Sequence, residues 1–261
     1  MAHLFIFGLG YSAKRIRAAA EARGWRVSGT GAEAELAFDD ETAVRGAVTK
    51  ASHVLSSVPP GEMGDPVLAR YGDALRQGWL GYLSSTGVYG DTGGAWVDET
   101  APAGAGRRSA RSEADAAWLE RGARVFRLPG IYGPGRSALD RVAEGRAHRV
   151  DLPGQVFSRV HVDDIAAGVI AGLDAPAGAY NLADDLPASQ NAVVEEACRL
   201  LGIELPPMRS LDEAGLPPQA RAFYAENRRV ANGKAKRVLG WRPAFPTYRE
   251  GLRAIVRPTS P

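Results

Sequence analysis

A glycine-rich turn directly follows the first apolar run of the chain and restricts what the chain can fold into. The run His3 to Phe7 reads HLFIF and stops at Gly8, as a strand buried in a parallel sheet does. Helical composition follows from Tyr11 to Arg23. A buried strand, a glycine turn and a helix in immediate succession are the opening of a β-α-β unit, so a parallel sheet is expected.

The same alternation of strands and helices continues through the first half of the chain. Strand-like apolar runs and helical segments follow one another at residues 25–30, 41–50, 52–58, 65–77, 79–84, 107–121 and 124–128. This order predicts an α/β fold, a Rossmann-type doubly wound parallel sheet with helices on both faces.

The pattern loosens after Pro129, where a smaller C-terminal lobe is expected to bind substrate. A helix at about 163–175 is expected to return to the main sheet. The predicted division is residues 1–130 plus about 161–176 for the Rossmann domain, and about 131–160 and 177–261 for the smaller lobe.

The glycine turn has the residues that a nicotinamide dinucleotide, NAD or NADP, requires. Gly8 allows the tight turn, Gly10 lets the backbone approach a pyrophosphate, and Ala13 permits close helix packing. The amides at the helix start then attract the phosphates. The alternative is an ordinary strand-to-helix turn without a ligand. The predicted cofactor-binding residues in the first three strand ends are Gly8, Gly10, Tyr11, Ser12, Ala13, Thr30 and Ser57.

The end of the second strand favours NADP over NAD. The segment Val27 to Gly31 lacks the Asp or Glu that would accept a hydrogen bond from the ribose 2′-hydroxyl of NAD. No arginine stands there to hold a 2′-phosphate either. Lys14 and Arg15 are candidates for that role, and the alternative is that both are surface charges on the first helix.

Charge and metal-ligand content argue against two kinds of partner. The chain has 32 Lys and Arg against 30 Asp and Glu, which is not the basic excess of a nucleic-acid binder. His3, His53, His148 and His161 have no paired spacing, so no metal site is expected. Cys198 lies in an apolar helical stretch and is predicted to be core.

Apolar runs long enough for a membrane span are missing from the sequence. None reaches the roughly 20 residues that a bilayer requires, and the first residues have no basic leader or cleavage site. We therefore expect a cytoplasmic monomer or homodimer that acts on a small molecule.

Four motifs give the chain a resemblance to a known family. The sequence is similar to the extended short-chain dehydrogenase/reductases, which include nucleotide-sugar epimerases and dehydratases, and in particular to their atypical members. The motifs that carry the resemblance occur in the expected order, at 8–13, 83–90 (LSSTGVYG), 127–135 (RLPGIYGPG) and 159–165 (RVHVDDI).

The resemblance implies roles for residues at the strand ends. It assigns Ser85 to a hydrogen bond with the substrate oxygen, with Thr86 assisting, and the alternative is that these hydroxyls bond their own backbone. It places Pro129, Gly130 and Ile131 beside the nicotinamide. Tyr132, Arg136 and Arg159 would contact substrate, where a guanidinium could pair with a diphosphate or a carboxylate; equally, the two arginines could cap loop carbonyls.

The catalytic pair of that family is missing. The family uses a Tyr followed four positions later by a Lys, and the matching positions here are Arg107 and Arg111. An arginine stays protonated and cannot act as a general acid or base. Arg111 could still bind the nicotinamide ribose, or could be an exposed helix residue. Tyr89 and Tyr132 are candidate substitutes for the acid, or else packing aromatics.

Two functions follow from these observations. One is an NAD(P)-dependent oxidoreductase or epimerase that acts on a nucleotide sugar or a similar small polar molecule. The other is a non-catalytic dinucleotide-binding sensor, which the missing Tyr and Lys favour.

Overall fold

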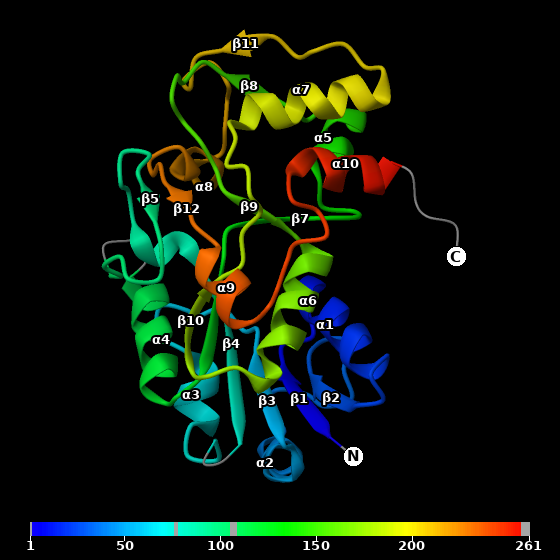
Figure 1. Ribbon diagram of the computed structural model, residues 1–261, viewed down its shortest axis with the longest axis vertical. Helices are drawn as coiled ribbons and strands as arrows, with labels where there is room; N and C mark the ends of the chain where they lie inside the picture. The colour runs from blue at the N-terminus through cyan, green and yellow to red at the C-terminus, as the bar shows by residue number, and fades with distance from the viewer. Residues whose placement is uncertain (1, 76–77, 105–108, 257–261) are drawn as a thin grey trace.

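A six-stranded, entirely parallel sheet forms the centre of the molecule (Figure 1). The computed structural model describes residues 2–75, 78–104 and 109–256. The strand order is β10-β6-β4-β3-β1-β2. Helices cover both faces, so the predicted doubly wound α/β fold is confirmed. The strands are β1 (His3–Phe7), β2 (Arg26–Thr30), β3 (His53–Ser56), β4 (Trp79–Ser85), β6 (Arg124–Leu128) and β10 (Gly178–Asn181).

Alternation along each strand divides the core into two layers. In β1, Leu4 and Ile6 pack toward α1 (Tyr11–Glu21) and α6 (Val162–Ala171). Phe5 and Phe7 pack on the opposite side. That second layer contains α2 (Glu41–Lys50), α3 (Pro66–Tyr71) and α4 (Ser109–Glu120). Because both faces are buried, the strands read as continuous apolar runs in the sequence.

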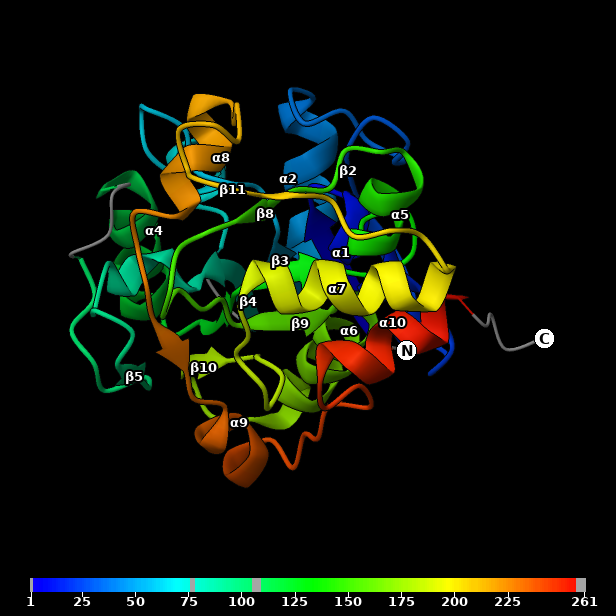
Figure 2. The ribbon, with the colours of Figure 1, turned by 90° about the horizontal axis from the view of Figure 1, so that it is seen from above.

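A smaller lobe lies beyond the carboxyl ends of the strands. Its core joins α5 (Ala138–Ala143), α7 (Gln190–Leu201) and α10 (Tyr248–Val256). Seen from above, α7 and α10 run beside each other (Figure 2). The remaining elements are β5 (Trp96–Val97), β7 (Gly130–Tyr132), β8 (Arg149–Val150), β9 (Arg159–His161), β11 (Met208–Arg209), α8 (Pro218–Phe223), β12 (Arg229–Val230), α9 (Gly233–Val238) and the 3-10 turns η1 (Thr86–Tyr89) and η2 (Gly172–Asp174).

The chain crosses between the two parts more often than the sequence indicates. We expected residues after 177 to belong to the smaller lobe, yet β10 pairs in parallel with β6 at the edge of the main sheet. Ala235 and Trp241 also pack into the core of the main domain. A four-residue strand has too little pattern to reveal its sheet, since its partner is decided by tertiary packing.

Candidate functional site

Neighbouring strands on both sides hold the glycine turn. Gly8 has a φ of +82°, which only glycine adopts readily. The amides of Gly8 and Leu9 donate to the carbonyl oxygen of Thr30, at 3.1 and 2.8 Å. The Ser57 hydroxyl donates to the carbonyl oxygen of Gly8 at 2.6 Å. Thr30 and Ser57 therefore position the turn from β2 and from the residue after β3.

An open cradle for an anion lies at the start of α1. Gly10 has a φ of −87°, so its backbone does not require glycine. A Cβ at this position would meet no atom within 4 Å and would fill the space in front of the helix. Gly10 is the N-cap residue and provides no side-chain acceptor to the amides of the first turn, which include those of Tyr11 and Ser12. Those amides can bind a phosphate.

The cradle lies at the point where the strand order reverses. From β1 the chain proceeds to β2 on one side, and β3 lies on the other. Ligands of doubly wound sheets bind beyond the carboxyl ends of the strands at this point. Ala13, fully buried, allows α1 to approach the sheet closely. The residues present thus fit a dinucleotide pyrophosphate.

The two candidate cations on α1 point in different directions. The ammonium of Lys14 pairs with Glu33 at 2.5 Å, on the loop after β2. Arg15 faces Asp163 of α6, 3.6 Å away. Lys14 is therefore the cation beside the end of β2, where the adenosine ribose of a dinucleotide would lie. The sequence pattern does not point to Glu33, because this residue stands three positions beyond Thr30, the last residue of β2.

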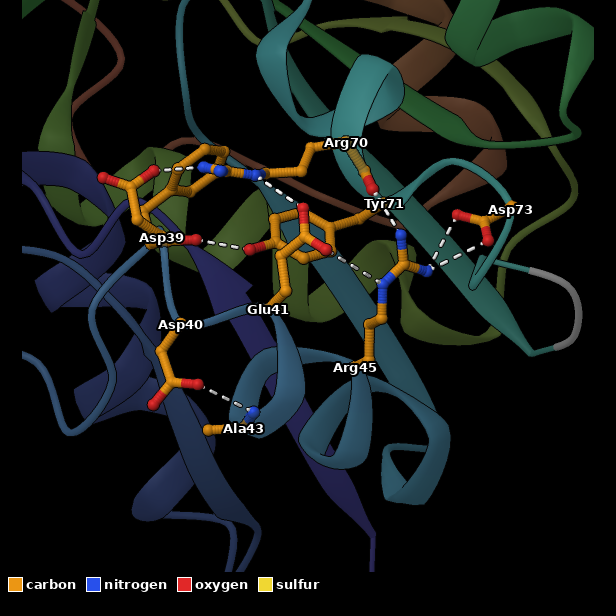
Figure 3. A network of polar contacts seen from close by, with 9 residues as sticks. Asp39, Asp40, Glu41, Ala43, Arg45, Arg70, Tyr71 and Asp73 are labelled. Atoms are coloured by element: carbon orange, nitrogen blue, oxygen red, sulfur yellow. Dashed lines mark hydrogen bonds and ion pairs between the residues drawn. The ribbon is translucent and has the colours of Figure 1, made fainter.

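An ion-pair network anchors the end of the same loop (Figure 3). Arg70 of α3 contacts Asp39 and also Glu41, the first residue of α2. Arg45 pairs with Asp73 at 2.9 Å, and the Tyr71 hydroxyl donates to the carbonyl oxygen of Phe38. Each exposed pair contributes little to stability, but together they tie α2, α3 and the loop to one another.

Ser85 ends β4 with its hydroxyl proton available. The Gly87 amide donates to the Ser85 oxygen at 3.1 Å, so this oxygen is the acceptor that caps η1. Ser85 is half-buried, whereas Thr86 is almost fully buried. A hydroxyl that accepts a backbone hydrogen bond can still donate its own proton. Ser85 can therefore donate to a substrate oxygen.

A buried polar network occupies the region behind Ser85. Arg127 of β6 forms a two-point ion pair with Asp115 of α4, at 2.7 and 3.1 Å. Ser84 donates to the same carboxylate at 2.6 Å. Arg127 also donates to the Tyr89 hydroxyl at 3.0 Å, and that hydroxyl donates to the side chain of Asn181 at 2.8 Å.

This network determines what the Tyr89 hydroxyl can do. Both its donor and one acceptor position are used inside the protein. Burial raises the pKa of Tyr89, although the nearby Arg127 opposes the increase. The side chain is only 3% exposed. A tyrosine in this position is a poor proton donor to a substrate bound at Ser85.

Arg111 lies against a different tyrosine. Its positive charge faces the Tyr82 hydroxyl, whose pKa burial nevertheless raises to about 12. The Tyr82 ring stacks on Trp118 of the same helix. Arg111 therefore lies near a core tyrosine of β4. Arg107, the position that matches the family's tyrosine, lies outside the described residues.

Tyr132 and Arg159 are both enclosed by protein. The Tyr132 hydroxyl reaches Gly251 of α10, where a Cβ would stand 2.1 Å from it, and burial raises the pKa of this tyrosine. Arg159 donates to the carbonyl oxygens of Phe157 and Ala188, each at 2.8 Å. Burial lowers its pKa to about 10. These contacts favour structural roles over substrate contact.

The segment 129–136 passes from β6 to the glycine turn. Gly130, which is exposed, donates its amide to the carbonyl oxygen of Ser158, and Pro129 and Ile131 beside it are partly exposed. Farther along, the Arg136 guanidinium lies over the Tyr11 ring, 5.6 Å from its centre. The structure thus places Arg136 beside the first residue of α1; the sequence alone predicts that it contacts substrate.

Arg228 is a residue of the site that sequence reasoning missed. It donates from Nη1 to the carbonyl oxygen of Gly90 at 2.6 Å and to Glu226 at 2.8 Å. Its Nη2 lies 4.0 Å from the position of a Cβ on Gly87, in the turn that Ser85 caps. It is distant in sequence from that turn and belongs to no recognisable motif, so only the folded chain brings it there.

Two further observations describe the wider surroundings. Within the ranges that the structure describes, no helix combines the length and apolarity of a membrane span. Over the same ranges, no three side chains of the metal-binding types converge.

Comparison with known proteins relates the whole chain to a solved structure. A functionally unknown conserved protein from Silicibacter pomeroyi DSS is 39% identical, with 98% of each chain covered and a TM-score of 0.87. The human epimerase family protein SDR39U1, solved with NADPH, is 15% identical over 98% of this chain and 99% of that one, with a TM-score of 0.77. At 15% identity, the similarity to SDR39U1 shows a shared fold.

A partial match connects the chain to a named reductase. The 3-diazoavenalumate denitrifying reductase of a Streptomyces species is 33% identical over 140 residues, which are 49% of this chain and 45% of that protein. The match therefore spans less than half the length of this relative. No protein-family model matches the chain.

Proposed function

Because the chain belongs to the family of the Silicibacter pomeroyi protein and has the extended short-chain dehydrogenase/reductase fold, we propose that it is an NAD(P)H-dependent reductase of a small polar substrate. The observation that carries this proposal is the open cradle at Gly10, in front of the uncapped amides of α1. The human relative was solved with NADPH, and the Streptomyces relative is named a reductase.

Different residues of the chain have different roles in such a reaction. When bound, a reduced nicotinamide supplies a hydride. The Ser85 hydroxyl donates to the substrate oxygen and stabilises the negative charge that develops there. The Tyr89 hydroxyl is bound to Asn181 and Arg127, so we assign the final proton to water. Such a site suits substrates that need little acid assistance.

Cofactor preference follows from the end of β2. We assign NADP because Lys14 stands beside this strand end and can pair with a 2′-phosphate. The carboxylate of Glu33 competes for the same ammonium. Nucleotide sugars are one substrate class to test, since the fold is shared with an epimerase family protein.

A dinucleotide sensor is the second candidate function. The ion pair between Arg127 and Asp115 supports it, because the polar groups near the expected acid are committed to each other. A sensor would bind the dinucleotide without turning over any substrate. Both candidates share the cradle at Gly10.

Calorimetric titration of NADPH into the wild type and Gly10→Val tests the cradle. The valine fits the backbone, and its side chain would occupy the open space at the start of α1 where the phosphate is proposed to bind. Loss of two or more charge-assisted hydrogen bonds should raise the Kd by about 100-fold or more. The control is Gly46→Val, on the exposed side of α2. Absence of heat with the wild type, or equal affinity of Gly10→Val, contradicts the proposal.

Turnover then separates the enzyme from the sensor. A panel of nucleotide sugars, aldehydes and ketones is mixed with the NADPH-loaded protein, and loss of nicotinamide absorbance is followed. For any active substrate, Ser85→Ala should lower kcat by about 100-fold. Tight NADPH binding without turnover across the panel favours the sensor.

A further inference from the structure

The second lobe reaches the cofactor cradle through a short turn, residues 133–136. The amide of Gly133 donates to the carbonyl oxygen of Arg136, and the Arg136 amide donates back, at 3.2 and 3.0 Å. Ser137, the next residue, caps α5 in a reciprocal arrangement with Asp140. The backbone of Arg136 is therefore held on both sides, and only its side chain retains freedom.

Tyr11 fastens this turn to the opening of α1. The Tyr11 hydroxyl donates to the carbonyl oxygen of Pro134 at 3.1 Å. A Cβ on Gly133 would stand 2.5 Å from the Tyr11 hydroxyl oxygen and 2.6 Å from a methyl carbon of Val162. Glycine at 133 is thus what allows the two lobes to meet here. Tyr11 is also the first residue of α1, so its own amide lies at the cradle.

The Arg136 guanidinium lies beside this contact, and none of the described residues forms an ion pair with it. It lies over the Tyr11 ring and is exposed. In the described parts of the chain, no carboxylate lies within 4 Å of it. The neighbouring acids have other partners, since Asp163 faces Arg15 and Asp140 accepts from Ser137. A planar cation held this way suits an anion with several oxygens.

We propose that Arg136 binds the diphosphate of the dinucleotide from the second lobe, opposite the amides of the glycine turn. This inference rests on the proposed function and deepens it, because it assigns to the cofactor a residue that sequence reasoning assigned to the substrate. The contact between Tyr11 and Pro134 keeps the guanidinium at the cradle before the ligand arrives.

The experiment compares ligands with and without a diphosphate. NADPH, ADP-ribose and AMP are titrated calorimetrically into the wild type, Arg136→Gln and Arg136→Lys. Arg136→Gln removes a charge-assisted, two-point contact, so the Kd values for NADPH and ADP-ribose should rise by about tenfold or more. AMP binding should change less than about twofold. The affinity of Arg136→Lys should fall between those of the wild type and Arg136→Gln, because a lysine keeps the charge but cannot donate two parallel hydrogen bonds as a guanidinium does.

The control is Arg146→Gln, which removes the same charge from an exposed position in the same lobe. It should bind all three ligands as the wild type does. Equal affinity of Arg136→Gln and Arg146→Gln for ADP-ribose overturns the inference, as does an equal loss for AMP. Wild-type protein that binds no dinucleotide overturns the proposed function itself, so the two failures are distinguishable.

Discussion

The polar groups of the glycine turn and those behind Ser85 are bonded in opposite ways. At the glycine turn, the amides that open α1 have no side-chain cap, and Gly10 keeps the space before them free. Behind Ser85, the side chains of Asp115, Arg127 and Tyr89 are all bonded to one another or to neighbours within the protein. The amides of the glycine turn are left without a side-chain acceptor, whereas the polar side chains behind Ser85 are paired within the protein.

The two regions illustrate two kinds of dependence on the sequence. Backbone amides at a helix start depend on the fold and not on particular side chains. Proton transfer depends on a side chain with a suitable pKa at one position. Replacement of that side chain removes the chemistry, and neighbouring polar groups can then become part of the core.

The largest effect is expected from Asp115→Ala, which disrupts the buried polar network behind Ser85. Arg127 would be left as a buried charge without its partner, and unfolding free energy should fall by about 3–5 kcal/mol. Chemical denaturation measures the change. Glu113→Ala, on the exposed side of α4, is the matched control and should have little effect. A loss as small as that of the control would show that the network does not stabilise the fold.

A smaller effect is expected from Tyr89→Phe. The change leaves Arg127 and Asn181 each short of one hydrogen bond, and should cost about 1–3 kcal/mol of stability by the same denaturation assay. For any substrate that the panel identifies, kcat should stay within a few-fold of the wild type. A drop of about 100-fold in kcat, with NADPH affinity unchanged, would instead make Tyr89 the general acid.

The smallest effect is expected near the glycine turn, from Glu33→Gln. The substitution frees Lys14 from its ion pair, so NADPH should bind a few-fold more tightly relative to NADH. Lys14→Gln should shift that preference the other way. Glu21→Gln, near the end of α1, removes the same charge elsewhere and serves as the control. If Glu33→Gln tightens NADH more than NADPH, Lys14 does not face the 2′-phosphate.

Much of the fold could be predicted because its signals are local. Apolar runs, glycine turns and helical segments follow one another along the sequence, and right-handed β-α-β connections leave few topologies. The glycine turn itself could also be recognised, since strand, turn and helix are contiguous. Arg136 and Tyr132, by contrast, share one short motif yet have different surroundings. The Arg136 side chain lies over the Tyr11 ring at the start of α1, and Tyr132 lies in the core of the second lobe.

By itself, the sequence determined the parallel α/β architecture, the position of the glycine turn and the lack of a Tyr-x-x-x-Lys string, since each depends on neighbouring residues. Only the tertiary structure decided that Tyr89 is bound to Arg127, that Lys14 meets Glu33, and that Arg228 stands beside the Ser85 turn. These contacts join residues far apart in the chain. Their geometry depends on how the strands and lobes pack, which no local pattern encodes.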